Sequence, residues 1–179
     1  MCAADVIEIL GKESTARKVI RNLLRKGWLT RFLIETLWPE LARRYPLSAT
    51  QRGLAGHSLG SLLALYALIR EPLFFTHVLA SAPSIWWDDR SILRLTAARH
   101  AHNAILPAKL FLSVGEEDTS SMTGDLTRLE QQLAAQRFAQ LQVTSRRFPR
   151  RNHFNVINDA FLAGLIALFS SHPGAARVE

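Results

Sequence analysis

A serine set between two glycines is the first candidate for chemistry, in the pentapeptide Gly56-His57-Ser58-Leu59-Gly60. It lies between a short apolar run and a strongly amphipathic segment, so we expect a strand, a sharp turn and a helix in that order. In so tight a turn a β-carbon two residues from the serine would collide with neighbouring backbone, and we therefore expect both glycines to be required. The turn would present the Ser58 hydroxyl as a nucleophile and direct the Leu59 amide toward an oxyanion.

A serine hydroxyl needs a base to become a good nucleophile. The sequence offers six candidates: His57, His77, His100, His102, His153 and His172. Where a serine follows a strand in this way, the acid and then the histidine come later along the chain. His153 follows the last predicted strand and is the candidate base. The alternative interpretation is a surface histidine that caps a helix.

Carboxylates that could orient this histidine follow the strand before the last one. Parallel sheets gather their sites at the carboxyl ends of their strands. Asp118 is the first choice because the step from Gly115 leads out of a strand into a loop that could reach His153. Four other carboxylates stay open as the acid: Glu116, Glu117, Asp88 and Asp89. For one of the last two, we expect instead a role as the cap of a helix beginning at Arg90.

Alternating strands and helices would position these side chains. Short apolar runs predict strands over residues 53–56, 77–80, 109–114 and 141–144. Helical periodicity predicts helices over 59–70, from about 90, over 123–138 and over 155–169. This alternation predicts βαβ units, and hence an α/β fold in which helices cover both faces of a mostly parallel sheet.

The region before the first of these strands has a different character. Residues 13–45 show apolar residues at three- and four-residue steps with basic residues between them, which predicts a helix that Pro39 should kink or divide. With no linker, repeat or low-complexity tract, we interpret residues 1–179 as one domain. Within it, residues 1–45 are mainly helical and atypical, and residues 46–170 carry the strand–helix pattern.

Composition excludes several classes of protein. With 48% hydrophobic and 21% charged residues over 179 residues, the chain is neither disordered nor collagen-like. Its single cysteine, Cys2, excludes an intrachain disulfide and a cysteine-based zinc site. The start lacks the features of a secretory signal, so we expect a cytoplasmic protein. A periplasmic location stays open if a segment before Met1 is missing.

Together these motifs resemble the putative-esterase branch of the α/β-hydrolases. The likeness spans residues 29–169 and is strongest to the siderophore trilactone esterases of the enterobactin and bacillibactin type. It is carried by the pentapeptide, by the segment 81–88 with its Trp86-Trp87 pair, and by His153 after a basic loop. The resemblance implies ester hydrolysis by Ser58 with His153 as base, through an acyl-enzyme and without a cofactor or metal.

The resemblance also implies a small-molecule ester as the partner, with neither nucleic acid nor a membrane. For an anionic ferric siderophore, Arg150 and Arg151 could hold the charge, and Trp86 and Trp87 could stack on a catechol ring. His57, the variable position of the pentapeptide, is a further candidate for substrate binding. The alternative interpretation is that Arg150 and Arg151 are solvated surface residues and that at least one of Trp86 and Trp87 packs in the core.

Length limits what the resemblance can imply. The family places several strands before its serine, and a loop among them supplies the second oxyanion amide. Here 57 residues precede Ser58, so the resemblance predicts a truncated sheet of about four strands that lacks half of the oxyanion hole. A serine esterase is the leading hypothesis and a non-catalytic remnant the second. An anion- or nucleic-acid-binding module that uses the net charge of +7 is a third.

Overall fold

The computed structural model describes residues 27–170, which form two compact units that divide between Leu47 and Ser48. The first unit is helical, and its described part contains α3 (Trp28–Arg31), η1 (Phe32–Leu37) and α4 (Trp38–Arg44). Pro39 stands in the first turn of α4, directly after the π-helical stretch η1. A widened turn before a proline accommodates the backbone hydrogen bond that the proline cannot donate. The rest of the predicted helix, residues 13–26, lies outside the described residues.

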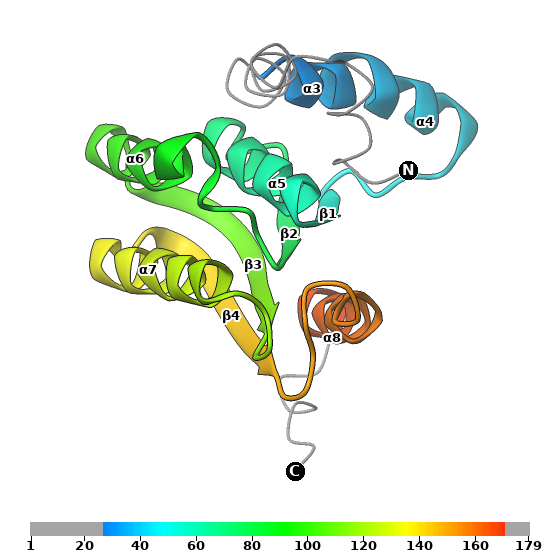
Figure 1. Cartoon of the computed structure of the whole chain (residues 1–179). Helices are drawn as coiled ribbons and strands as arrows, with labels where there is room; N and C mark the ends of the chain where they lie inside the picture. Colours follow the sequence, from blue (N-terminus) through cyan, green and yellow to red (C-terminus); the bar gives the residue numbers. More distant parts are fainter. Residues whose placement is uncertain (1–26, 171–179) are drawn as a thin grey trace, which may run out of the picture. The chain divides into compact units, whose positions relative to one another are not determined.

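The second unit is a parallel sheet covered by helices on both faces. Its strands are β1 (Gly53–His57), β2 (His77–Ser81), β3 (Ile105–Gly115) and β4 (Ala139–Phe148), in the spatial order β1-β2-β3-β4. Every neighbouring pair is parallel. Its helices are α5 (Leu59–Arg70), α6 (Trp87–His102), α7 (Ser120–Gln136) and α8 (Ile157–Phe169). Helices α5, α6 and α7 lie on one face of the sheet and α8 on the other (Figure 1), which confirms the predicted fold class.

Close packing of α8 on the sheet depends on a small residue. A β-carbon at Gly164 would lie 2.4 Å from Leu79 Cδ1, so α8 sits directly against β2 at this point. Leu79, Phe111 and Leu168 form a buried cluster between this helix and the sheet. Since α8 follows the loop that carries His153, this packing fixes where that loop returns to the sheet.

The strand register brings four loops to one edge of the sheet. His57 pairs with Ser81, Ser81 pairs with Ser113, and Gly115 pairs with Phe148. The strands therefore end at nearly the same level, as expected where parallel sheets build their sites. The segments that follow them carry Ser58, the Trp-Trp segment, the acidic segment and His153.

Candidate active site

Ser58 occupies a strained turn between β1 and α5. Its backbone has φ 57° and ψ −120°, a conformation that side-chain-bearing residues rarely adopt and that is typical of functional sites. Its N–H donates to the Ser81 carbonyl at 3.0 Å, which ties the turn to β2. The Leu59 N–H belongs to the first residue of α5, where no acceptor exists within a helix.

The two glycines of the pentapeptide have different roles. A β-carbon at Gly56 would lie 2.2 Å from the carbonyl carbon of Gly60, a distance that backbone cannot tolerate. A β-carbon at Gly60 would meet no atom within 4 Å. The expectation that both glycines are required is therefore wrong for Gly60, because this residue faces open space and Gly56 faces the first turn of the helix.

A row of hydrogen bonds joins the three residues that the sequence singled out. The Ser58 Oγ lies 3.1 Å from His153 Nε2, and His153 Nδ1 lies 2.9 Å from Asp118 Oδ2. The Asp118 side chain is 1% exposed, and its other oxygen accepts the Thr119 N–H at 2.8 Å. Hydroxyl, imidazole and carboxylate in this order can pass a proton from the serine to the histidine while the carboxylate orients the ring.

Close backbone contact positions the loop that carries His153. The Arg151 carbonyl accepts the Glu117 N–H at 2.9 Å, and a β-carbon at Gly115 would lie 2.1 Å from the same oxygen. Asn152 Oδ1 accepts the N–H groups of Phe154 and Asn155, which closes a tight turn around His153. From the sequence, Gly115 served only to mark where a strand ends, and Asn152 was not singled out; the asparagine beside the histidine was the available signal for a turn.

The other candidate acids lie apart from this row. Glu116 and Glu117 have exposed side chains, and Asp89 forms an ion pair with Arg94 at 2.9 Å. The prediction that Asp88 or Asp89 caps a helix at Arg90 is wrong, because all three have left-handed backbone and α6 begins at Trp87. The ion pair between Arg90 and the buried Asp125 of α7, at 2.8 Å, fastens this unusual turn.

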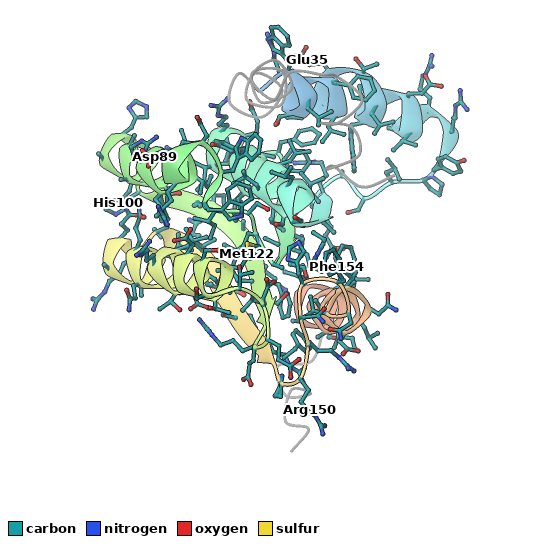
Figure 2. The ribbon with its side chains drawn as sticks, viewed as in Figure 1. Glu35, Asp89, His100, Met122, Arg150 and Phe154 are labelled. Atoms are coloured by element: carbon teal, nitrogen blue, oxygen red, sulfur yellow. The ribbon has the colours of Figure 1, made fainter. Side chains whose placement is uncertain are left out.

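Aromatic side chains near the site differ in exposure. Trp86 is 43% exposed and Trp87 is 7% exposed, so Trp87 packs in the core. Phe154 is 78% exposed (Figure 2). Its ring lies edge-on against the His153 ring, with centroids 5.5 Å apart. The sequence reasoning did not single out Phe154, although it directly follows His153.

The two arginines proposed for anion binding are in different settings. Arg150 lies on the connection from β4 to α8, and its side chain points outward, away from Phe154 (Figure 2). Arg151 donates to Asp159 at 2.5 Å, which offsets its charge. Among the described residues, Arg150 is thus the one of the two with no ion pair.

Ser84 is a buried hydroxyl beside Ser58 that the sequence reasoning did not single out. Its Oγ lies 3.2 Å from Ser58 Oγ, and its N–H donates to the Ser58 carbonyl at 3.3 Å. No spacing rule points to this contact, because it depends on how the loops after β1 and β2 fold over each other.

His57 packs against His153, with ring centroids 4.7 Å apart, and its Nδ1 lies 3.1 Å from Ser81 Oγ. Burial, and next the charge of a protonated His153, lower the pKa of His57 to about 4. His57 is therefore neutral at pH 7 and places no positive charge beside His153.

The depressed pKa of His57 makes stability depend on pH. In the unfolded chain a histidine takes up a proton near pH 6.5, whereas folded His57 does so near pH 4. Its contribution to stability is therefore complete above pH 6.5 and is lost as the pH falls toward 4. We expect about 1–2 kcal/mol of lost unfolding free energy, after allowance for partial exposure. Urea unfolding at pH 7 and pH 4.5 should show this loss, and His57→Gln should reduce it; equal losses in both proteins would contradict the assignment.

Across residues 27–170 no group of three His, Cys, Asp or Glu side chains could hold a metal ion. Over the same residues no helix has the length and apolar character to cross a membrane.

Comparison with known proteins places the chain among esterases. The sequence profile of the family described as "Putative esterase" matches residues 13–160. The chain is 29% identical over 150 residues to "Ferri-bacillibactin esterase BesA" of Bacillus subtilis strain 168, which covers 80% of this chain and 50% of that protein. It is 43% identical over 63 residues to "Siderophore triacetylfusarinine C esterase" of Aspergillus fumigatus, which covers 35% of this chain and 22% of that protein.

Solved structures agree with the sequence matches. Siderophore hydrolase EstB from Aspergillus nidulans superposes with a TM-score of 0.71 at 25% identity, over 84% of this chain and 59% of that one. The chain spans half or less of the length of the two curated relatives named above. The family match covers most of the sequence, from residue 13 into α8. The chain therefore belongs to the putative esterase family.

Proposed function

We propose that the protein hydrolyses carboxylic esters through an acyl-enzyme formed on Ser58. The observation that carries this proposal is the continuous row from Ser58 Oγ through both nitrogens of His153 to the buried Asp118 carboxylate. A buried carboxylate that accepts the Nδ1–H leaves Nε2 free to accept a proton, which is the tautomer a general base requires. The strained backbone of Ser58 further supports a reactive role for its hydroxyl.

The reaction follows from this geometry in two stages. Ser58 Oγ attacks the ester carbonyl carbon while its proton passes to His153 Nε2, and His153 then protonates the departing alcohol. The Leu59 N–H donates to the oxygen that gains negative charge. In the second stage water attacks the acyl carbon and gives a proton to His153. The Ser58 oxygen then leaves the acyl group and takes that proton.

A siderophore ester is the substrate class that we propose. The relatives named above are described as esterases of ferri-bacillibactin and triacetylfusarinine C, which supports this class. The half-exposed Trp86 offers a flat surface for an aromatic ring, and the Arg150 charge would favour an anionic substrate.

Labelling with a fluorophosphonate probe tests the proposal. We expect covalent modification of Ser58, shown by peptide mass spectrometry, and turnover of p-nitrophenyl acetate. Both should be lost in Ser58→Ala, because the hydroxyl that contacts His153 Nε2 is then absent. A folded protein that neither reacts with the probe nor turns over the ester would instead be a non-catalytic member of the family.

A further inference from the structure

We propose that Ser84 is a catalytic residue whose hydroxyl donates a hydrogen bond to the nucleophilic oxygen of Ser58. This inference rests on the proposed function and adds a fourth group to the row of three. Its basis is the 3.2 Å contact between the two Oγ atoms. Either atom of an isolated hydroxyl pair could be the donor, but here the neighbouring groups decide the direction.

The direction follows from the other end of the row. The Asp118 carboxylate can only accept, so His153 Nδ1 carries the proton of their 2.9 Å hydrogen bond. A neutral His153 then has no proton on Nε2 and accepts one from Ser58 Oγ at 3.1 Å. Ser58 has one hydroxyl proton, and it is committed to His153. The proton between the two serines must therefore belong to Ser84.

The backbone holds Ser84 in place for this contact. Ser84 is 2% exposed, and its N–H donates to the Ser58 carbonyl at 3.3 Å. Its own carbonyl accepts the Trp87 N–H at 3.1 Å, which closes the turn after β2. Together with the hydrogen bond from Ser58 N–H to the Ser81 carbonyl, these contacts join the loops after β1 and β2 at several points. The donor is thus fixed before substrate binds, which is the condition for useful electrostatic stabilisation.

The Ser84 hydrogen bond acts on the charge of the Ser58 oxygen. During attack, a bond forms from Oγ to the acyl carbon and the Oγ proton moves to His153, while Ser84 keeps its own proton. One Oγ lone pair accepts from Ser84, and another remains for the attack. In the second stage the bond between Oγ and the acyl carbon breaks, and the oxygen regains electron density. As its proton moves to His153, the Ser58 oxygen gains partial negative charge, which the Ser84 donor stabilises. The same donor stabilises this oxygen when it leaves the acyl carbon, so both formation and breakdown of the acyl-enzyme are expected to depend on Ser84.

Substitution of Ser84 tests this role, with a matched serine as control. Removing a hydrogen bond to a group that gains charge in the transition state should lower the rate by about 10- to 100-fold. We expect Ser84→Ala to show this loss in fluorophosphonate labelling of Ser58 and in both the burst and steady phases of p-nitrophenyl acetate hydrolysis. The KM should change little. Ser113→Ala deletes an equally buried hydroxyl on β3 that has no partner among the described residues, and it should label at the unaltered rate.

Two further readouts separate a donor from a packing role. Ser84→Cys fills nearly the same space with a weaker donor and should also label at least threefold more slowly. The loss in Ser84→Ala should be constant from pH 6 to pH 9 because this hydroxyl does not titrate, whereas a displaced His153 would change the pH profile. Labelling within twofold of the unaltered rate by either folded variant would overturn the role of Ser84. Absence of labelling in the unaltered protein would instead refute the proposed function, and the Ser84 role with it.

Discussion

Replacing Asp118 by asparagine should lower the turnover of p-nitrophenyl acetate by about 10⁴-fold, the loss that the equivalent change produces in a serine protease of another fold. The asparagine would occupy the same space, so the loss comes from the histidine. An amide can donate to Nδ1, and His153 would then carry its proton on Nε2. In that tautomer Nε2 cannot accept the Ser58 proton, although the three side chains stay in place. Steady-state rates at pH 7.5 measure the effect.

The matched control for this variant is Glu117→Gln. Both changes convert a carboxylate to an amide within one acidic segment, but the Glu117 side chain is exposed and its contact with the His153 loop runs through the backbone N–H. We therefore expect turnover by Glu117→Gln to stay within twofold of the unaltered rate. A large loss in Glu117→Gln with full activity in Asp118→Asn would mean that Glu117, and not Asp118, orients His153.

Sequence reasoning identified the residues of the row because each has a signal along the chain. The glycine spacing marked Ser58, and the order of strands selected His153 and favoured Asp118. The structure brings these three within hydrogen-bond distance, while their catalytic roles stay predictions. The parallel α/β class of the fold was predictable for a similar reason. Apolar runs that alternate with segments of helical periodicity are compatible with few folds.

Features that depend on contact between distant segments were not predictable. The Ser84 contact with Ser58 arises from the register of β1 against β2, and Gly115 is required because the Arg151 carbonyl approaches it. Neither pair has a characteristic sequence spacing. The bounds of strand β4 were also predicted incompletely: the prediction covered residues 141–144, and the strand runs over Ala139–Phe148. It pairs with β3 alone among the described strands, and its exposed polar residues carry no apolar signal.

The left-handed turn at residues 88–90 could not be predicted from the sequence for a different reason. Aspartate and arginine have no general preference for three successive positive φ angles. Arg90, the last of the three residues, forms an ion pair with the buried carboxylate of Asp125 on α7, a contact between segments that are distant in sequence. Local propensity at Asp88 and Asp89 favoured a helix cap, which the structure does not contain.

Alanine at Gly56 and at Gly60 should have opposite effects on stability, although both residues belong to the same pentapeptide. A β-carbon at Gly56 would lie 2.2 Å from the Gly60 backbone, so the first turn of α5 must move. We expect a loss of about 2–4 kcal/mol in unfolding free energy and a fall of at least 100-fold in labelling, because that turn carries the Ser58 oxygen and the Leu59 amide.

At Gly60 the space is open and the residue lies within α5, where alanine is favoured over glycine by about 0.5–1 kcal/mol. Gly60→Ala should therefore unfold at equal or higher urea concentration, with labelling within threefold of the unaltered rate. Urea unfolding followed by circular dichroism, with fluorophosphonate labelling of the same samples, compares the two variants. Equal losses of stability and labelling in both variants would mean that the turn requires glycine at both positions. Unchanged stability and labelling in Gly56→Ala would mean that the first turn of α5 can move without harm to the site.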